Sequence, residues 1–260
     1  MFVLANGAFK SGSTWLREIA MRMVEFAEIP PAYQHPRFSH WVDPKKLKMF
    51  LERADYRGQN YISKGHFYRP QDRTLLLSHD EVYVLDIRRD IKDVLVSHYY
   101  HLQRQRKIRT KFSRYYWTLG RFKAHQIKQY HRIWGVDSPQ IYVSSFEQLK
   151  TNFEEEVRNI GRFLGLDLSD AKLRWLEEQT TIEQLRKQNR EEDKPEGERF
   201  FRRGAVGDWK DHFDEKALED LQRIKEEGLR GIGLAKYHLL FAARPLLNSC
   251  LRLRAKAMST

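Results

Sequence analysis

The chain begins with the sequence MFVLANGAFKSGSTW (residues 1–15), and this stretch decides the fold. Phe2–Asn6 is a short apolar run without polar alternation, which is typical of a buried parallel strand. Gly7–Ser13 is a loop of small residues, and Thr14–Glu28 places its apolar residues on one helical face. A strand, a loop and a helix in this order direct backbone N–H groups at one point, so the stretch predicts an anion-binding loop.

The loop has the residue types that bind phosphate groups. Gly12 allows the backbone to approach a ligand, the hydroxyls of Ser11, Ser13 and Thr14 can donate hydrogen bonds, and Lys10 supplies a positive charge. Nucleotide triphosphatases instead place the lysine directly after the second glycine of their motif. A P-loop nucleotide kinase or phosphotransferase therefore stays an alternative with a misplaced lysine, and an ordinary serine-rich helix N-cap is the structural alternative.

Three more apolar, β-rich runs follow along the chain, at Tyr61–Gly65, Val82–Ile87 and Ile141–Ser145. Helix-like stretches separate these runs. Strands that alternate with helices predict an α/β fold with a central, mostly parallel sheet flanked by helices. Besides the first helix, we expect helices at Asp90–Gln103, Arg114–Trp134, Phe153–Leu164, Ala171–Gln179 and Glu215–Glu227.

The net charge of +12 indicates an anionic ligand. A field of this sign attracts nucleotides, sulfates, nucleic acid and acidic lipid headgroups alike, and charge does not choose among them. A basic nucleic-acid-binding protein is therefore an alternative of a different class. That function would need a basic stripe with stacking aromatic residues outside the cleft and a steep salt dependence of binding.

Hydropathy and cysteine content bear on location and organisation. The sequence has no uninterrupted apolar run of about 18 residues and no basic segment ahead of a long apolar one near its N-terminus. The one cysteine, Cys250, excludes an internal disulfide. We expect a cytoplasmic protein with a single domain over residues 1–260. Residues 233–260 are predicted to form a basic helical extension, which either contacts an anionic membrane surface weakly or packs against the domain.

Two further segments carry arginines suited to anions. Arg89 follows the third strand and Ser97 lies about two helical turns later, so both can converge on one anion, although a charged first turn of a surface helix would look alike. The segment FFRRG (residues 200–204) lies at the end of a long basic loop, Arg186–Arg203. Its paired arginines either clamp a second phosphate or form a solvated charge run, and loops of this length often act as lids.

Together, in this order, the three elements resemble the sulfotransferase family that uses 3′-phosphoadenosine 5′-phosphosulfate (PAPS). The sequence KSGSTW at Lys10–Trp15 is similar to the family's 5′-phosphosulfate loop, Arg89–Ser97 to its 3′-phosphate segment, and RRGAVGDWK at Arg202–Lys210 to its C-terminal signature. The resemblance is nearest to the cytosolic, small-molecule branch. It implies a P-loop-like sulfotransferase fold and transfer of a sulfuryl group from PAPS to a hydroxyl or amine of a small organic acceptor, releasing adenosine 3′,5′-bisphosphate (PAP).

The resemblance also implies which residues bind the donor. The first loop would hold the 5′-phosphosulfate, the arginines and Ser97 the 3′-phosphate, and Trp15 would stack on adenine unless it is an ordinary buried aromatic residue of a helix. The residues assigned to the donor in this way are Lys10, Ser11, Gly12, Ser13, Thr14, Trp15, Arg89, Ser97, Thr180, Thr181, Phe200, Phe201, Arg202, Arg203 and Gly204.

The implied catalytic residue is His66, in the sequence Lys64-Gly65-His66, which is similar to the Lys-Thr-His of the family. His66 would act as the general base for in-line attack by the acceptor. Lys10, together with Lys64, would neutralise charge that develops on the oxygens of the leaving group. No metal is expected, since no ligand cluster with metal spacing occurs in the sequence. The other histidines are predicted to be structural.

Two departures from the family pattern bear on the adenine contact and on oligomerisation. Phe146 stands where a tyrosine commonly touches the adenine, and the family's dimer-forming segment is missing after Lys210, which leaves the oligomeric state open. The expected partner is a small-molecule acceptor, with no nucleic acid. Its pocket would be lined by the aromatic-rich segments Pro30–Trp41, Arg104–Trp117 and Asn189–Phe201, but no side chain in them identifies the acceptor.

Overall fold

The computed structural model describes residues 1–53, 58–195 and 199–239. A four-stranded parallel sheet lies at its centre, in the order β4-β1-β5-β6. Its strands are β1 (Phe2–Gly7), β4 (Tyr61–Lys64), β5 (Val82–Arg88) and β6 (Ile141–Ser145). The register places Phe2 of β1 opposite both Tyr61 and Val82. All four expected strands are present, and the predicted α/β architecture is confirmed.

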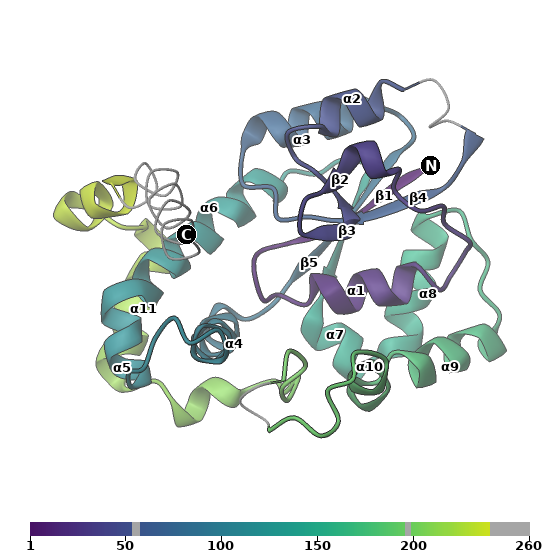
Figure 1. The fold of residues 1–260 in the computed structure, drawn as a ribbon. Helices are drawn as coiled ribbons and strands as arrows, with labels where there is room; N and C mark the ends of the chain where they lie inside the picture. The colour runs from purple at the N-terminus through teal and green to yellow at the C-terminus, as the bar shows by residue number, and fades with distance from the viewer. Residues whose placement is uncertain (54–57, 196–198, 240–260) are drawn as a thin grey trace, which may run out of the picture.

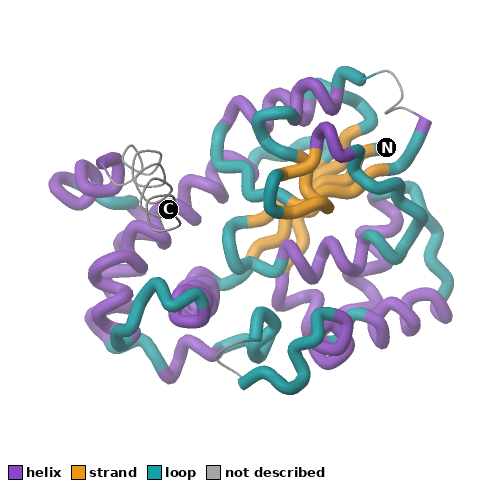
Figure 2. Tube along the Cα trace, viewed as in Figure 1, coloured by secondary structure: helices purple, strands orange, loops and turns teal. Residues whose placement is uncertain are grey.

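Helices cover both faces of this sheet (Figures 1 and 2). Side chains alternate between the faces of a strand, so Phe2 and Leu4 join one core while Val3 joins the other. The helices over the Leu4 face include α2 (Leu47–Leu51), α3 (Pro70–Leu77), α4 (Ile91–Arg104) and α6 (Arg121–Trp134), and α11 (Glu215–Glu227) packs against α6 in the same core. Those over the Val3 face include α1 (Ser13–Ala20), α7 (Phe146–Thr151), α8 (Phe153–Phe163) and α9 (Asp170–Gln179).

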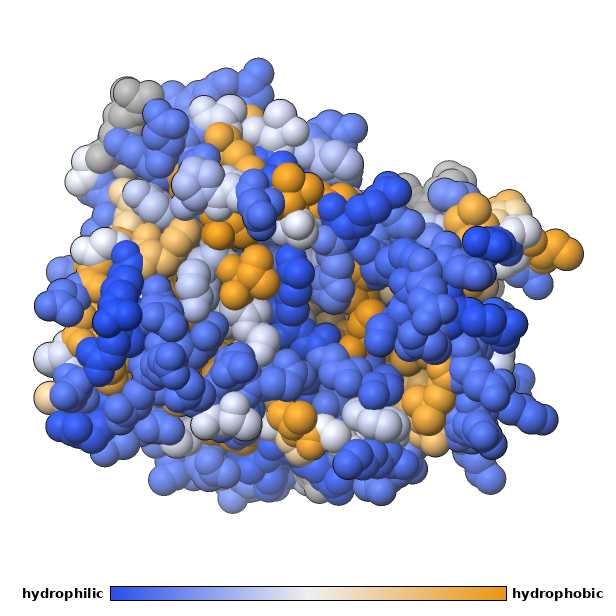
Figure 3. All heavy atoms as spheres, turned by 180° about the vertical axis from the view of Figure 1, so that it is seen from behind, coloured by the Kyte–Doolittle hydropathy of each residue, from blue (hydrophilic) through white to orange (hydrophobic). Residues whose placement is uncertain are grey.

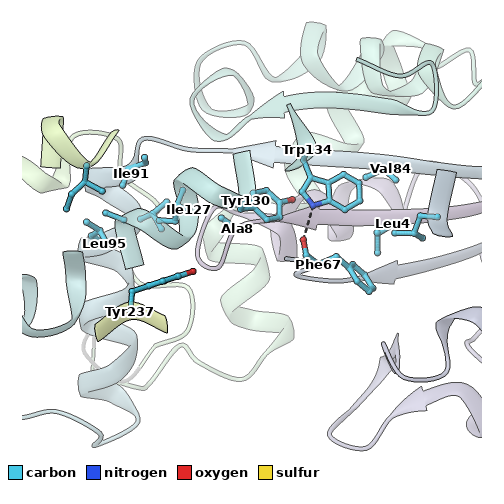
Figure 4. Close-up of a cluster of buried hydrophobic side chains, with 14 of the residues drawn as sticks. Leu4, Ala8, Phe67, Val84, Ile91, Leu95, Ile127, Tyr130, Trp134 and Tyr237 are labelled. Atoms are coloured by element: carbon cyan, nitrogen blue, oxygen red, sulfur yellow. Dashed lines mark hydrogen bonds between the residues drawn. The ribbon is translucent and has the colours of Figure 1, made fainter. Parts of the chain in front are cut away.

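The core on the Leu4 face joins α4 and α6 to the sheet (Figure 4). Trp134 and Tyr130 are fully buried in it, and both satisfy their polar atoms there. The Trp134 indole N–H donates to the carbonyl oxygen of Phe67 at 2.8 Å, and the Tyr130 hydroxyl donates to Asp86. Because buried polar groups are costly when unpaired, these bonds fix α6 in one position against β5 and the segment that follows β4.

The first helix is shorter than its sequence pattern predicts, and the prediction of helix to Glu28 was wrong. α1 ends at Ala20, and residues 21–24 form turns. The chain then runs beside β4, where the Ala27 backbone N–H donates to the carbonyl oxygen of Asn60 at 2.8 Å and Ala27 forms a parallel bridge with Tyr61. Pairing with the edge strand thus overrides the helical periodicity of this segment.

Other elements differ from the expected ones in smaller ways. The helix predicted over Arg114–Trp134 is divided into α5 (Phe112–Tyr115), a π-helical turn at Tyr116–Gly120, and α6. The basic loop predicted from Arg186 begins later, because α10 (Ile182–Gln188) extends into it. A two-stranded antiparallel hairpin of β2 (Gln34–His35) and β3 (Phe38–Val42) was not foreseen.

The C-terminal extension is described only at its start. Residues 231–239 are helical. Tyr237 is buried, and its ring meets the ring of His125 on α6 edge to face, with centroids 4.8 Å apart. The described part of the extension therefore packs against the domain. Residues 240–260, which include Pro245 and Cys250, lie outside the described residues.

The surface is mostly polar, in agreement with the mean hydropathy of −0.71. Hydrophilic side chains cover most of the face opposite to that of Figure 1, and hydrophobic atoms form separate groups among them (Figure 3). No helix in the described part of the chain combines the length and apolar character needed to cross a bilayer.

Candidate functional site

A cavity of about 1170 Å³ opens at the carboxyl ends of β1, β4 and β5. This edge is where open α/β sheets gather ligands. In Figure 1, α4 lies on one side of this region and α1, α7 and α10 lie on the other. Every residue predicted for the site lines the cavity except Ser11. The site thus collects segments that lie nearly 200 positions apart, from Lys10 to Gly204.

The loop between β1 and α1 has two residues in the left-handed region, Lys10 at φ 62° and Gly12 at φ 110°. A Cβ atom at Gly12 would lie 2.8 Å from the ring of Phe146, so glycine is required there for both φ and space. Ser11 is buried, and its hydroxyl donates to the Ala8 carbonyl oxygen at 2.7 Å. Its hydroxyl therefore braces the loop from inside and does not face the cavity.

Lys10 lies at the centre of a group of cations. Its Nζ atom is 4.4 Å from the centroid of the Phe200 ring. Burial, followed by the positive charges of Lys64 and Arg104, lowers the pKa of Lys10 to about 7. Burial and nearby positive charge both disfavour the ammonium form, and a bound anion would reverse the second effect. The site is thus arranged for a negatively charged ligand.

His66 is held in one tautomer by the main chain of the first loop. Its Nδ1 atom lies 2.7 Å from the carbonyl oxygen of Gly7. A carbonyl oxygen only accepts, so Nδ1 carries the hydrogen and Nε2 keeps its lone pair. Burial and the charge of Lys64 lower the pKa of His66 to about 3, so the ring is neutral near pH 7. Nε2 is therefore available to accept a proton.

Lys64 and Trp41 form the neighbouring wall. The Nζ atom of Lys64 is 4.6 Å from the centroid of the Trp41 ring, and the Trp41 and His66 rings meet edge to face at 5.9 Å. Burial and Arg17 lower the pKa of Lys64 to about 8. Trp41 comes from the unforeseen hairpin, which therefore contributes an aromatic surface beside the candidate base.

Arg89 reaches the cavity from the end of β5. Its Nη2 atom donates to the Ala205 carbonyl oxygen at 2.7 Å, and its guanidinium carbon is 4.1 Å from the centroid of the Phe146 ring. Its Nε atom is buried without a hydrogen-bond partner among the described residues. A buried donor without a partner is costly, and an anion in the cavity is the kind of group that would satisfy it.

Arg202 and Arg203 share the carboxylate of Asp208. Arg202 forms an ion pair with Asp208, and the Nη1 atom of Arg203 lies 3.2 Å from Oδ1 of the same residue. The guanidinium of Arg202 also stacks over the ring of Tyr100 on α4, 4.1 Å from its centroid. These contacts hold both arginines at the cavity wall before a ligand enters, which lowers the entropic cost of binding one.

Helix α4 anchors this segment. The carboxylate of Asp93 accepts hydrogen bonds from the backbone N–H groups of Gly207 at 2.8 Å and Trp209 at 3.1 Å. The neighbouring Lys92 places its Nζ atom 3.6 Å from the centroid of the Trp209 ring. The second and third sequence motifs, separated by more than 100 residues, are therefore in direct contact.

Other predicted residues line the cavity with part of their polar atoms already engaged. The Thr180 hydroxyl donates to the Leu176 carbonyl oxygen at 2.7 Å, and that of Thr181 accepts from the Gln184 N–H at 3.1 Å to cap α10. Trp15 packs edge to face on Phe146, with ring centroids 5.4 Å apart, and its indole N–H is buried without a partner among the described residues. Ser97 and Phe201 also line the cavity.

Three histidines predicted to be structural also line the cavity: His40, His98 and His101. The Nδ1 atom of His98 lies 2.8 Å from the Tyr115 hydroxyl, and burial keeps the pKa of His98 well below its ordinary value. His101 is four residues beyond Ser97 and so shares its helical face, which is the signal that could have identified it. His212 contacts Tyr100 and does not line the cavity, in agreement with its predicted structural role.

A metal centre is not visible in this site. Among residues 1–53, 58–195 and 199–239, no group of three or more His, Cys, Asp or Glu side chains is arranged to hold a metal ion. The polar groups that converge on the cavity are mainly cationic, as in Lys10, Arg89 and Arg202. Such a set suits an anion rather than a metal ion.

Comparison with known proteins identifies the family. Residues 3–233 match the model of the sulfotransferase domain. The chain is 26% identical to rabbit sulfotransferase 1C2 over 252 residues, which cover 85% of this chain and 81% of that protein. It is 29% identical to zebrafish sulfotransferase 6B1 over 161 residues, or 58% of this chain and 53% of that protein.

Solved structures agree on the fold. Mouse sulfotransferase SULT7A1, crystallised with PAP, aligns with a TM-score of 0.63 at 19% identity and covers 93% of this chain and 88% of its own. Retinol dehydratase, crystallised with androsterone and the inactive cofactor PAP, aligns with a TM-score of 0.57 at 19% identity, over 88% of this chain and 82% of its own. The domain match over nearly the whole described chain means that this protein belongs to the sulfotransferase family.

Proposed function

We propose that the protein transfers a sulfuryl group from PAPS to an oxygen or nitrogen atom of a small acceptor and releases PAP. One observation carries the proposal: Lys10, Arg89, Arg202 and Arg203, from three distant segments, line one cavity together with His66. The PAP complexes of two proteins with the same fold support the choice of donor.

The residues of the cavity fit the three parts of such a donor, namely the 5′-phosphosulfate, the 3′-phosphate and the adenine. Lys10 and the N–H groups at the start of α1 would hold the 5′-phosphosulfate. Arg89, Arg202 and Arg203 would hold the 3′-phosphate, with Ser97 beside them, and the unpartnered Nε atom of Arg89 supports this assignment. Trp15 and Phe146 would offer aromatic surfaces to the adenine. When bound, the donor supplies the activated sulfuryl group.

His66 would take the proton from the attacking atom of the acceptor. Its Nε2 lone pair is free because Nδ1 is bonded to Gly7, and general-base catalysis of this kind typically contributes about 10²–10⁴ in rate. The negative charges of the donor would raise the pKa of His66 from its low value, which makes the ring a stronger base when the site is filled. Lys10 and Lys64 would stabilise charge that develops on the leaving oxygens.

Family membership favours this function over a P-loop kinase or a nucleic-acid-binding protein. The comparison with relatives also supports a cytoplasmic location as part of the proposal, since one relative is named cytosolic sulfotransferase 10, from Arabidopsis, at 23% identity.

The test is a comparison of ligands followed by a transfer assay. PAP should raise the melting temperature more than ATP with or without magnesium, because only PAP has a 3′-phosphate for the arginines. Labelled PAPS would then be screened against phenols, alcohols and amines, with His66→Ala as the inactive control. Equal stabilisation by PAP and ATP, together with no labelled product from any acceptor, would reject the proposal.

A further inference from the structure

One wall of the cavity carries more positive charge than the donor assignment uses. It is formed by the second half of α4, the loop after it and the start of α6. The residues of this wall that line the cavity are His98, His101, Leu102, Arg104, Gln105, Lys107, Lys123 and Gln126. No acidic residue of the described chain lines the cavity from this wall, whereas Arg104, Lys107 and Lys123 all do.

The acidic residues that do line the cavity lie elsewhere. Glu18 pairs with Arg17 and Arg22 on the α1 side, and Asp208 pairs with Arg202 and Arg203 at the proposed donor site. Glu177 and Glu183 come from α9 and α10. The carboxylates of the cavity are therefore on the sides formed by α1, α9, α10 and the C-terminal motif.

The wall lies beside the point of transfer. The guanidinium carbon of Arg104 is 5.4 Å from the centroid of the Phe200 ring, and Lys10 approaches the same ring at 4.4 Å. The Nζ atom of Lys123 is 4.8 Å from the centroid of the Phe9 ring, which in turn lies 4.8 Å from that of His98. The cationic wall thus continues directly from the residues proposed to hold the sulfuryl group.

The electrostatic consequence is visible at His101. Burial comes first, and then the charges of Lys10, Arg104 and Lys107, in lowering its pKa to about 4. A partly buried region lined by cations raises the local concentration of anionic ligands and repels cationic ones. A neutral phenol or alcohol would leave this potential unused, and an amine cation would meet repulsion.

We infer that the acceptor is itself an anion: a small hydroxy or amino compound whose carboxylate, phosphate or sulfate group lies against Arg104, Lys107 and Lys123 while its nucleophilic atom reaches His66. This inference rests on the proposed function, since it specifies the acceptor of that reaction. Arg104, with its planar guanidinium, offers a bidentate contact to such a group, and the two lysines add charge around it.

The experiment uses matched acceptors that differ only in charge. One set is 3-(4-hydroxyphenyl)propanoate with its methyl ester and its amide, and equivalent sets carry an aliphatic alcohol or an amine as nucleophile. A phosphate monoester and a sulfate monoester of 4-hydroxybenzyl alcohol distinguish the kind of anion. For each set, kcat/KM is measured with saturating PAPS, and binding to the PAP complex is measured separately by calorimetry.

The test variants are Arg104→Gln and Lys107→Gln, and the matched control is Arg109→Gln. Arg109 lies on the same loop and is exposed, but it does not line the cavity. The wild type should prefer the acid to its ester by at least about tenfold, since hydrogen bonds to charged groups contribute about 1.5–3 kcal/mol. Each test variant should lose most of that preference through KM, while Arg109→Gln keeps it. All three should bind PAP within about threefold of the wild type.

Two results would overturn the inference and leave the proposed function standing. In the first, the enzyme sulfates or binds neutral acceptors as well as their acids in every set. In the second, Arg104→Gln weakens PAP as strongly as a substitution of Arg89, which would assign the wall to the donor. If PAP does not bind and no acceptor reacts, the proposed function fails as well as the inference about the acceptor. That outcome is therefore distinct from the two results that overturn the inference alone.

Discussion

The carboxylate of Asp93 accepts the backbone N–H of Gly207 at 2.8 Å, although 114 positions separate them in the sequence. Asp93 is 1% exposed and also accepts the N–H of Trp209. The bond ties α4, which carries Ser97 and Arg104, to the segment that carries Arg202 and Arg203. The two halves of the proposed 3′-phosphate site are therefore positioned by one buried carboxylate.

Substitution of Asp93 by alanine should loosen that connection. Both N–H groups would lose their partner, and we expect a loss of about 2–4 kcal/mol in the free energy of unfolding, since each bond to a charged group contributes about 1.5–3 kcal/mol. PAP affinity should fall as well, because Arg202 and Arg203 lose their fixed position. Chemical denaturation and calorimetry measure the two effects. Asp211→Ala, an exposed change on the same turn, is the control and should alter neither.

The role of His66 is tested by its replacement with alanine and with asparagine. Both variants should lose about 10²–10⁴ in turnover, the usual contribution of a general base, and should bind PAP within a few-fold of the wild type. Asparagine can still donate a hydrogen bond to Gly7, so equal losses in both variants would identify proton transfer, rather than the loop contact, as the missing function. Turnover close to that of the wild type in either variant would remove His66 from the mechanism.

Arg89 should discriminate ligands by their 3′-phosphate. Arg89→Ala is expected to weaken PAP by about 10- to 100-fold and to weaken adenosine 5′-monophosphate much less, because a charge-assisted pair contributes about 1.5–3 kcal/mol and the monophosphate has no 3′-phosphate. Titration calorimetry with both nucleotides gives the ratio. Equal losses for the two ligands would contradict the assignment of Arg89 to the 3′-phosphate.

The affinity for PAP should depend on pH through Lys10. The ammonium form binds the anion, and its pKa of about 7 in the free site means that this form is lost as the pH rises above about 7. Binding should therefore weaken from pH 7 to 9 and be accompanied by proton uptake, detectable in buffers of different ionisation enthalpy. In the Lys10→Arg variant the arginine stays charged throughout this range. The variant should therefore lose most of the pH dependence of PAP affinity that comes from Lys10 and keep the part that comes from Lys64. A pH-independent affinity in the wild type would contradict the prediction.

The parallel sheet could be predicted from the sequence because three of its strands, β1, β4 and β5, are largely buried on both faces. Phe2, Val3 and Leu4 are each fully buried, so the run reads as continuously apolar and contrasts with the amphipathic helices around it. The end of α1 could not be predicted in this way. Ala27 leaves the helical pattern to pair with Tyr61, and a contact between distant segments leaves no local signal in the sequence.

The residues of the candidate site could be predicted where they belong to a short sequence motif. The first loop was located correctly, but its sequence does not reveal which hydroxyl faces inward, and Ser11 proved to bond to Ala8. His98 and His101 were missed as cavity residues because the motif ends at Ser97, while the helix continues along the same wall. Their place depends on the rotation of α4 against α6, which packing determines.

Helix α4 also fixes the spacing between the proposed donor site and the proposed acceptor site. Ser97 and Arg104 lie on the same helix seven positions apart, which corresponds to two turns and about 10 Å of rise. On these proposals, substitution of single side chains near Arg104 should change the acceptor preference and leave donor binding unchanged. Adding or deleting one residue between them would rotate Arg104 by about 100° and point it away. The length of α4 therefore sets the distance between the two proposed sites. Acceptor preference in this fold should change through substitution of side chains on α4, while the number of residues in the helix stays the same.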